Sequence, residues 1–155
     1  MDRSLRHRIL AAMADTFRAV DQPDWPLKFS LVELGPLGDE DHRKRYTLGI
    51  VPGPERYTHN FPYVVRFLRV AIEFRVTVNR DDEAPGELAE QLLTVIERVV
   101  IKNGTWGDLA LATELSNSEI DMTTYSDRSV AGVLFVEIQY RHSHLDPRNP
   151  DPDVY

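Results

Sequence analysis

The chain has 155 residues, of which 42% are hydrophobic, so it is long enough for one core and too short for two comfortable domains. It contains no cysteine, which excludes disulfides, thiolate ligands and a thiol nucleophile, and its formal charge of −7 disfavours a nonspecific grip on DNA. No apolar run approaches the roughly 20 residues that span a bilayer and the N-terminus lacks a signal-peptide pattern, so we expect a soluble intracellular protein.

The first half of the chain predicts one helix followed by a strand hairpin. Apolar residues recur at helical spacing from Leu5 to Val20, which predicts a helix over residues 3–20 that ends before the prolines of DQPDWP. The strand-like stretches LKFSLVEL and RKRYTLGIV, joined by the glycine- and acid-rich GPLGDEDH, predict a hairpin over residues 27–52. A proline-rich loop, PGPERYTHNFPY, is expected over residues 53–65.

The second half opens with the strongest periodic signal of the chain. Apolar and polar residues alternate through RFLRVAIEFRVTVN, which predicts a long strand over residues 66–79 with one buried face. Apolar spacing predicts a second helix over residues 85–102, with a proline near its first turn and a glycine just past its end. Two more strands are expected over residues 109–123 and 130–143, followed by an extended proline-rich arm over residues 145–155.

These elements favour an α+β fold, a largely antiparallel β-sheet with two α-helices packed on one face, long hairpin and loop extensions and an extended C-terminal arm. Fully extended, the strand over residues 66–79 would run about 46 Å, whereas a domain of this size is roughly 40 Å across. The strand must therefore bend or project. The second sheet face carries polar residues of mixed sign, either as a solvated surface or as a subunit interface or channel lining: Arg69, Glu73, Arg75, Glu137, Gln139 and Arg141.

The chain carries no recognisable catalytic or metal motif. It has no glycine-rich phosphate loop, no histidine pair at metalloprotease spacing and no serine in a nucleophile-elbow context. His142, His144 and Asp146 would turn to one side only if the last strand continued through Ser143, and Asp146 precedes a proline that should already end it. We favour an exposed strand end over a metal site, and assign no catalytic residue, no cofactor and no metal ligand.

The arrangement of elements resembles that of the tail terminator (tail completion) proteins of tailed bacteriophages. The resemblance covers nearly the whole chain, including the central RFLRVAIEFRVTV strand, the LAEQLLTVIERVV helix and the final strand AGVLFVEIQYRHSHLDP, which breaks at Asp-Pro. It is one of pattern, because none of these stretches is a catalytic signature.

The resemblance implies a structural, non-enzymatic subunit of a homo-oligomeric ring, a hexamer, located in the virion tail or neck and assembled in the host cytoplasm. Such a ring caps the head-proximal end of the tail tube, stops tube polymerisation and offers a surface to the neck proteins of the head. DNA would pass through without specific binding, and we hypothesise that an acidic or neutral lumen, in keeping with the charge of −7, avoids holding the phosphate backbone.

Within this interpretation, the loops GPLGDEDHRK and PGPERYTHNFPY are the expected inter-ring contacts, with Arg56, Tyr57 and Phe61 as anchors, since tyrosine and arginine are enriched in interface hot spots. The alternative is an ordinary cluster at a loop tip.

The main alternative function is a neck or head-completion adaptor protein. A small metal-dependent enzyme and a nucleic-acid-binding module, the latter resting on HRKR and RSLRHR, are the other classes left open.

Overall fold

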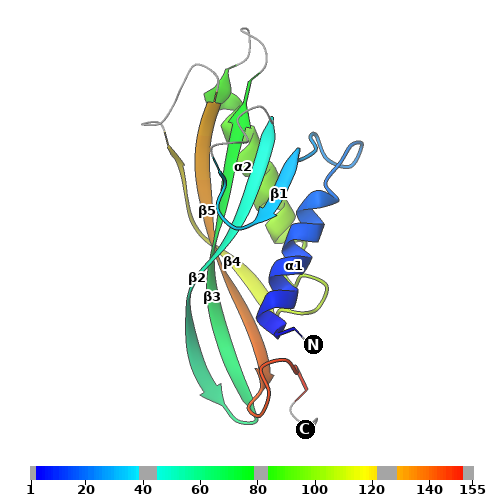
Figure 1. The fold of residues 1–155 in the computed structure, drawn as a ribbon, viewed down its shortest axis with the longest axis vertical. Helices are drawn as coiled ribbons and strands as arrows, with labels where there is room; N and C mark the ends of the chain where they lie inside the picture. Colours follow the sequence, from blue (N-terminus) through cyan, green and yellow to red (C-terminus); the bar gives the residue numbers. More distant parts are fainter. Residues whose placement is uncertain (1–2, 39–44, 79–83, 122–128, 152–155) are drawn as a thin grey trace.

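The computed structural model describes residues 3–38, 45–78, 84–121 and 129–151. These residues form two helices and five strands. The strands make one mixed, mostly antiparallel sheet in the order β1-β2-β3-β5-β4 (Figure 1). This arrangement confirms the predicted α+β class. The helices are α1 (Leu5–Arg18) and α2 (Pro85–Lys102), and the strands are β1 (Leu31–Leu34), β2 (Tyr46–Asn60), β3 (Tyr63–Thr77), β4 (Ala112–Asp121) and β5 (Ser129–Ser143).

α2 occupies the predicted residues 85–102, whereas α1 begins two residues later and ends two residues earlier than the predicted 3–20; both helices pack into one core with the sheet. The Ser4 hydroxyl caps α1 by accepting a hydrogen bond from the His7 backbone N–H at 3.2 Å, and Pro85 stands at the first turn of α2. The buried faces of both helices belong to the same hydrophobic cluster as the inward residues of β2, β3 and β5. Neither described helix is long and apolar enough to cross a bilayer.

The alternation predicted for the central strand is reproduced by burial in β3. Its even-numbered residues from Leu68 to Val76 are fully buried against the helices, while Arg69 on the other face is exposed. β3 pairs along its whole length with β5, from Tyr63 opposite Ser143 to Thr77 opposite Ser129. The expected last residue of the central strand, residue 79, and the expected end of the strand before β5, residues 122–123, lie outside the described residues.

The predicted hairpin over residues 27–52 is wrong, because β1 runs parallel to β2. Leu31 lies opposite Thr47 and Leu34 lies opposite Ile50. After β1 the chain crosses the sheet face that carries no described helix, where the Leu37 N–H donates to the Glu73 carboxylate at 3.3 Å. Gly49 permits this crossing, since a Cβ at that position would lie 2.5 Å from the Gly35 carbonyl oxygen.

The predicted loop over residues 53–65 is also wrong, because β2 continues to Asn60 and turns directly into β3. β1 pairs with β2 only as far as Ile50. Pro52 and Pro54 therefore lie where β2 is an edge strand, and a missing N–H donor is tolerated there. A register shift between Pro52 and Glu55 then reverses which residues face the helix side. This reversal interrupts the period of two and hides the strand from sequence analysis.

The far halves of β2, β3 and β5 project past both helices as a twisted ribbon (Figure 1). We call this part of the sheet, residues 55–68 together with 138–143, the ribbon. The expected overshoot of the central strand is thus a projecting hairpin whose turn contains Phe61.

The expected extended arm over residues 145–155 is corrected for its described part, residues 145–151. This segment turns back on the body: the Ser143 N–H donates to the Asn149 carbonyl at 2.6 Å, and the Leu5 N–H donates to the Pro147 carbonyl at 3.3 Å. The backbone donors of Leu5 and Ser143 thus bind carbonyls of this segment, so it packs on the body and does not extend away from it. Residues 152–155 of the predicted arm lie outside the described residues.

Replacing Gly132 in β5 with alanine is expected to lower the free energy of unfolding by about 1–3 kcal/mol through overpacking. A Cβ there would lie 2.4 Å from the Phe74 ring and 2.8 Å from the Glu119 carbonyl oxygen, and the latter belongs to the backbone of β4. Urea denaturation measures the change. The matched control is Gly86→Ala in α2, where a Cβ meets nothing within 4 Å and stability should be unchanged or slightly raised. Equal stability of the two variants would contradict the close packing at Gly132.

Candidate functional site

The three predicted contact residues all lie on the ribbon, but they do not share one face. Arg56 and Tyr57 are consecutive in β2, so their side chains point to opposite sides of the sheet. The Arg56 guanidinium lies 3.8 Å from the centroid of the Phe67 ring and 3.4 Å from the Glu137 carboxylate. Tyr57 is 56% exposed and Phe61, at the turn, is 81% exposed. Tyr57 and Phe61 therefore present apolar surface at the projecting end of the molecule.

The exposed turn is tied to the chain that follows β5. The His144 ring lies 4.8 Å from the Phe61 ring, and the His144 backbone N–H donates to the Pro62 carbonyl at 3.0 Å. The Nδ1 atom of His144 lies 2.9 Å from the same carbonyl oxygen. These contacts fix the direction in which the turn projects, which sequence analysis did not anticipate.

A buried polar cluster supports the ribbon beneath this turn. We call it the Glu55 cluster; it comprises Arg6, Glu55, Arg66, Tyr140 and His142. The Glu55 side chain is only 3% exposed and accepts from Arg66 at 3.1 Å, from Arg6 at 3.4 Å and from the Tyr140 hydroxyl. One carboxylate thus joins α1, β2, β3 and β5.

His142 closes the other side of the cluster with both ring nitrogens engaged. Its Nε2 accepts from the Arg66 Nε at 2.7 Å, and its Nδ1–H donates to the Ser143 carbonyl at 2.7 Å. Burial, followed by the nearby Arg66 charge, lowers the pKa of His142. Burial and the hydrogen bond to Glu55 raise the pKa of Tyr140. Both rings are therefore held neutral between two arginines and one carboxylate.

Acidification should weaken the folded state through His142. Because its pKa is lowered on folding, the unfolded chain takes up the proton first, so stability is intact above the ordinary histidine pKa of about 6.5 and falls as pH drops from there toward the lowered value. Urea unfolding at about pH 7.5 and about pH 5.5 measures this loss.

The control for this pH dependence is a variant at an exposed histidine. His142→Asn should flatten the stability change across the window, whereas His7→Asn should leave it intact, because His7 is exposed at the surface of α1. Asp146 does not interfere, since its pKa is lowered to about 2 by the hydrogen bonds from Arg148. An unchanged pH profile in His142→Asn would contradict the role of this ring.

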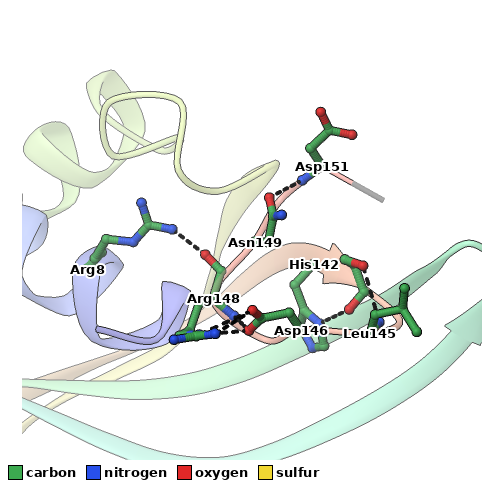
Figure 2. A network of polar contacts seen from close by, with 8 residues as sticks. Arg8, His142, Leu145, Asp146, Arg148, Asn149 and Asp151 are labelled. Atoms are coloured by element: carbon green, nitrogen blue, oxygen red, sulfur yellow. Dashed lines mark hydrogen bonds and ion pairs between the residues drawn. The ribbon is translucent and has the colours of Figure 1, made fainter. Parts of the chain in front are cut away.

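The three residues considered as metal ligands do not converge. Figure 2 shows the Asp146 carboxylate held by Arg148, with contacts of 2.8–3.2 Å to its guanidinium. Arg148 in turn accepts at its carbonyl from the Arg8 guanidinium at 2.7 Å, which ties this segment to α1. β5 does reach Ser143, as the metal alternative required, but His142 is buried and His144 is exposed beside the turn. Among the described residues, no group of three or more possible ligands gathers around a point.

The six predicted residues of the polar sheet face lie on the side turned away from the helices. Arg69 stands opposite Glu137 in the register of β3 and β5, and its guanidinium lies 5.0 Å from the Phe135 ring centroid. The Arg141 guanidinium lies 4.1 Å from the Tyr63 ring centroid. Glu73 and Arg75 hold the crossing segment after β1, through Leu37 and Gly38. Gln139 occupies the same face near the start of the ribbon.

The polar face also contains a hollow of about 700 Å³ that sequence analysis missed. We call it the sheet hollow. Its apolar part is formed by Ala71, Ala131, Val133 and Phe135, with Leu37 from the crossing segment at one side. The two alanines in outward positions of β3 and β5 were the available signal, because small residues there leave the sheet surface recessed.

Comparison with protein-family models gives no match, and comparison with curated proteins gives no significant match.

Proposed function

We propose that this protein is a structural subunit of a homo-oligomeric ring and that the ring is a phage tail terminator, which caps the head-proximal end of a tail tube. The observation that carries the proposal is the ribbon: a projecting hairpin with Phe61 and Tyr57 exposed at its end. Exposed aromatic residues on a rigid projection suit contact with a second protein.

The buried Glu55 cluster supports this interpretation. A projection made of three strands has little core of its own, and here the Glu55 carboxylate of β2, bonded to residues of three other elements, holds it to the body. Holding the ribbon in one direction lowers the ordering cost when it meets a partner. The role is steric: the ring occupies the end of the tube, blocks further subunits and presents a new surface to the neck proteins.

The polar sheet face supports the ring itself. It combines Arg69 and Arg141 stacked on aromatic rings with the recessed sheet hollow, on a face that no described helix covers. In a closed ring such a face would meet the neighbouring subunit or line the channel, through which DNA passes without being held.

The test is a capping reaction with purified components. Tail-tube protein of the same virus is allowed to polymerise with and without this protein, and tube lengths and tube ends are examined by electron microscopy. We expect shorter tubes that carry a ring at one end. Tubes of unchanged length with bare ends would contradict the terminator role, and binding to neck proteins instead would favour the adaptor alternative.

A further inference from the structure

Two surfaces on opposite sides of the body complement each other. One is the sheet hollow. The other lies at the C-terminal end of α2, on the far side of the sheet, and consists of Trp25, Arg98, Ile101 and Lys102 around a shallow depression of about 290 Å³. We call it the α2 patch. Of its members, Trp25 packs against the edge of the core, and none belongs to the ribbon.

The α2 patch is apolar at its centre and cationic at its edge. Ile101 is 69% exposed, the largest value among the large aliphatic side chains of the described residues. The Arg98 guanidinium and the Lys102 ammonium lie 5.3 Å and 5.6 Å from the Trp25 ring centroid. Cations are favoured at the C-terminal end of a helix, where the helix dipole is negative, and the indole face holds both in place. Asp24 is the single carboxylate at this depression.

The sheet hollow has the opposite charge pattern around a similarly apolar centre. Glu73, Glu119 and Asp121 line it together with one cation, Arg75, so carboxylates outnumber cations by three to one. At about 700 Å³, the hollow as a whole is large enough to admit an aliphatic side chain. An exposed isoleucine flanked by two cations is the kind of surface that such a hollow fits.

We propose that the α2 patch of one copy docks into the sheet hollow of the next copy. This inference rests on the proposed ring and specifies its subunit interface. The two surfaces lie on different faces of one chain, so their contact is heterologous, head to tail, which is the type of contact that closes a cyclic ring. Side-by-side packing of the bodies leaves the ribbons of all copies free to reach the tube.

The absence of cysteine from the chain allows a site-specific cross-linking test. Ile101→Cys and Ala131→Cys are made as separate variants, mixed, and treated with a short bis-maleimide. We expect a cross-linked dimer from the mixture, and from the variant that carries both cysteines a ladder that ends at the size of the ring. The control is Ile101→Cys mixed with Thr58→Cys, since Thr58 is exposed on the ribbon, outside the proposed interface.

Charge substitution then tests the complementarity. Arg98→Glu with Lys102→Glu, placed in the Ile101→Cys chain, should reduce the yield of cross-linked dimer by about tenfold or more through like-charge repulsion. Placing Glu119→Lys with Asp121→Lys in the Ala131→Cys chain should restore the yield. Restoration requires the two surfaces to face each other, so a merely damaged variant would not produce it.

The outcomes separate this interface from the ring. If native mass spectrometry finds a closed oligomer of the unmodified protein but the mixture of Ile101→Cys and Ala131→Cys gives no dimer, the interface is wrong and the ring stands. If the protein stays monomeric both at high concentration and on tail tubes, the ring and the interface are both overturned.

Discussion

Replacing Glu55 with alanine is expected to lower the free energy of unfolding by about 1.5–3 kcal/mol, because its buried carboxylate accepts charge-assisted hydrogen bonds from two partly solvated arginines. Glu55 is the only carboxylate among the five members of its cluster, and its side chain is 3% exposed. Without it, Arg66 keeps its bond to His142, but Arg66 and Arg6 lose the carboxylate that both contact, and the Tyr140 hydroxyl loses its acceptor. Chemical denaturation monitored by circular dichroism measures the loss.

Glu137→Ala is the matched control for this loss. Glu137 also pairs with an arginine on the ribbon, Arg56 at 3.4 Å, but the two side chains are 38% and 64% exposed. Solvent screening limits such a pair to about 0–1 kcal/mol. Both variants remove a carboxylate that contacts an arginine; the carboxylate is buried in one case and partly exposed in the other. Similar, small losses from both would contradict the view that the Glu55 cluster holds the ribbon to the body.

Replacing Phe61 with aspartate is expected to abolish tube capping while leaving the fold intact. Phe61 is 81% exposed, so its loss should change stability by about 0.5 kcal/mol or less. An aromatic anchor at the centre of an interface contributes about 2 kcal/mol or more, which corresponds to roughly a thirtyfold weaker complex. The measurement is the length distribution of tubes polymerised with the variant, next to its thermal unfolding curve.

Leu34→Asp provides the comparison for the tip variant. Leu34 is also an exposed apolar residue, at 46%, but it lies at the end of β1, away from the ribbon turn. It should cap tubes as the unmodified protein does. Normal capping by Phe61→Asp, or equal failure of both variants, would show that the ribbon end is not the contact with the tube.

The parts of the fold that sequence analysis predicted are those with an uninterrupted period. α1 and α2 carry apolar stripes bounded by Ser4 and Pro85, and β3 alternates from Leu68 to Val76 without a break. Burial follows these patterns because each element has one neighbour layer on one side. The two helices and the central strand were therefore predictable from local residue order alone.

The parts that were not predictable depend on pairing between distant segments. Nothing local to β1 distinguishes parallel from antiparallel contact with β2, and the decisive feature is the crossing over Gly49. The register shift after Pro52 inverts the faces of β2, so a strand was interpreted as a loop. Segments rich in proline can still be ordered when their carbonyls find donors, as Pro147 does with α1.

Some residues of the candidate site were likewise predictable from the sequence, and others were not. The exposure of Phe61 and Tyr57 was predictable because aromatic residues among prolines are conspicuous in a sequence. The Glu55 cluster was not, because its members are spread from Arg6 to His142 and only the folded ribbon brings them together. The acidic side of the sheet hollow likewise combines residues of β3 and β4, strands that are separated by β5.

The most direct test of the terminator proposal is electron microscopy of tails assembled in infected cells with and without this protein. The proposal predicts overlong or headless tails in its absence, and tails of uniform length with a ring at the head-proximal end in its presence. Tails of normal length that join heads in its absence would contradict it.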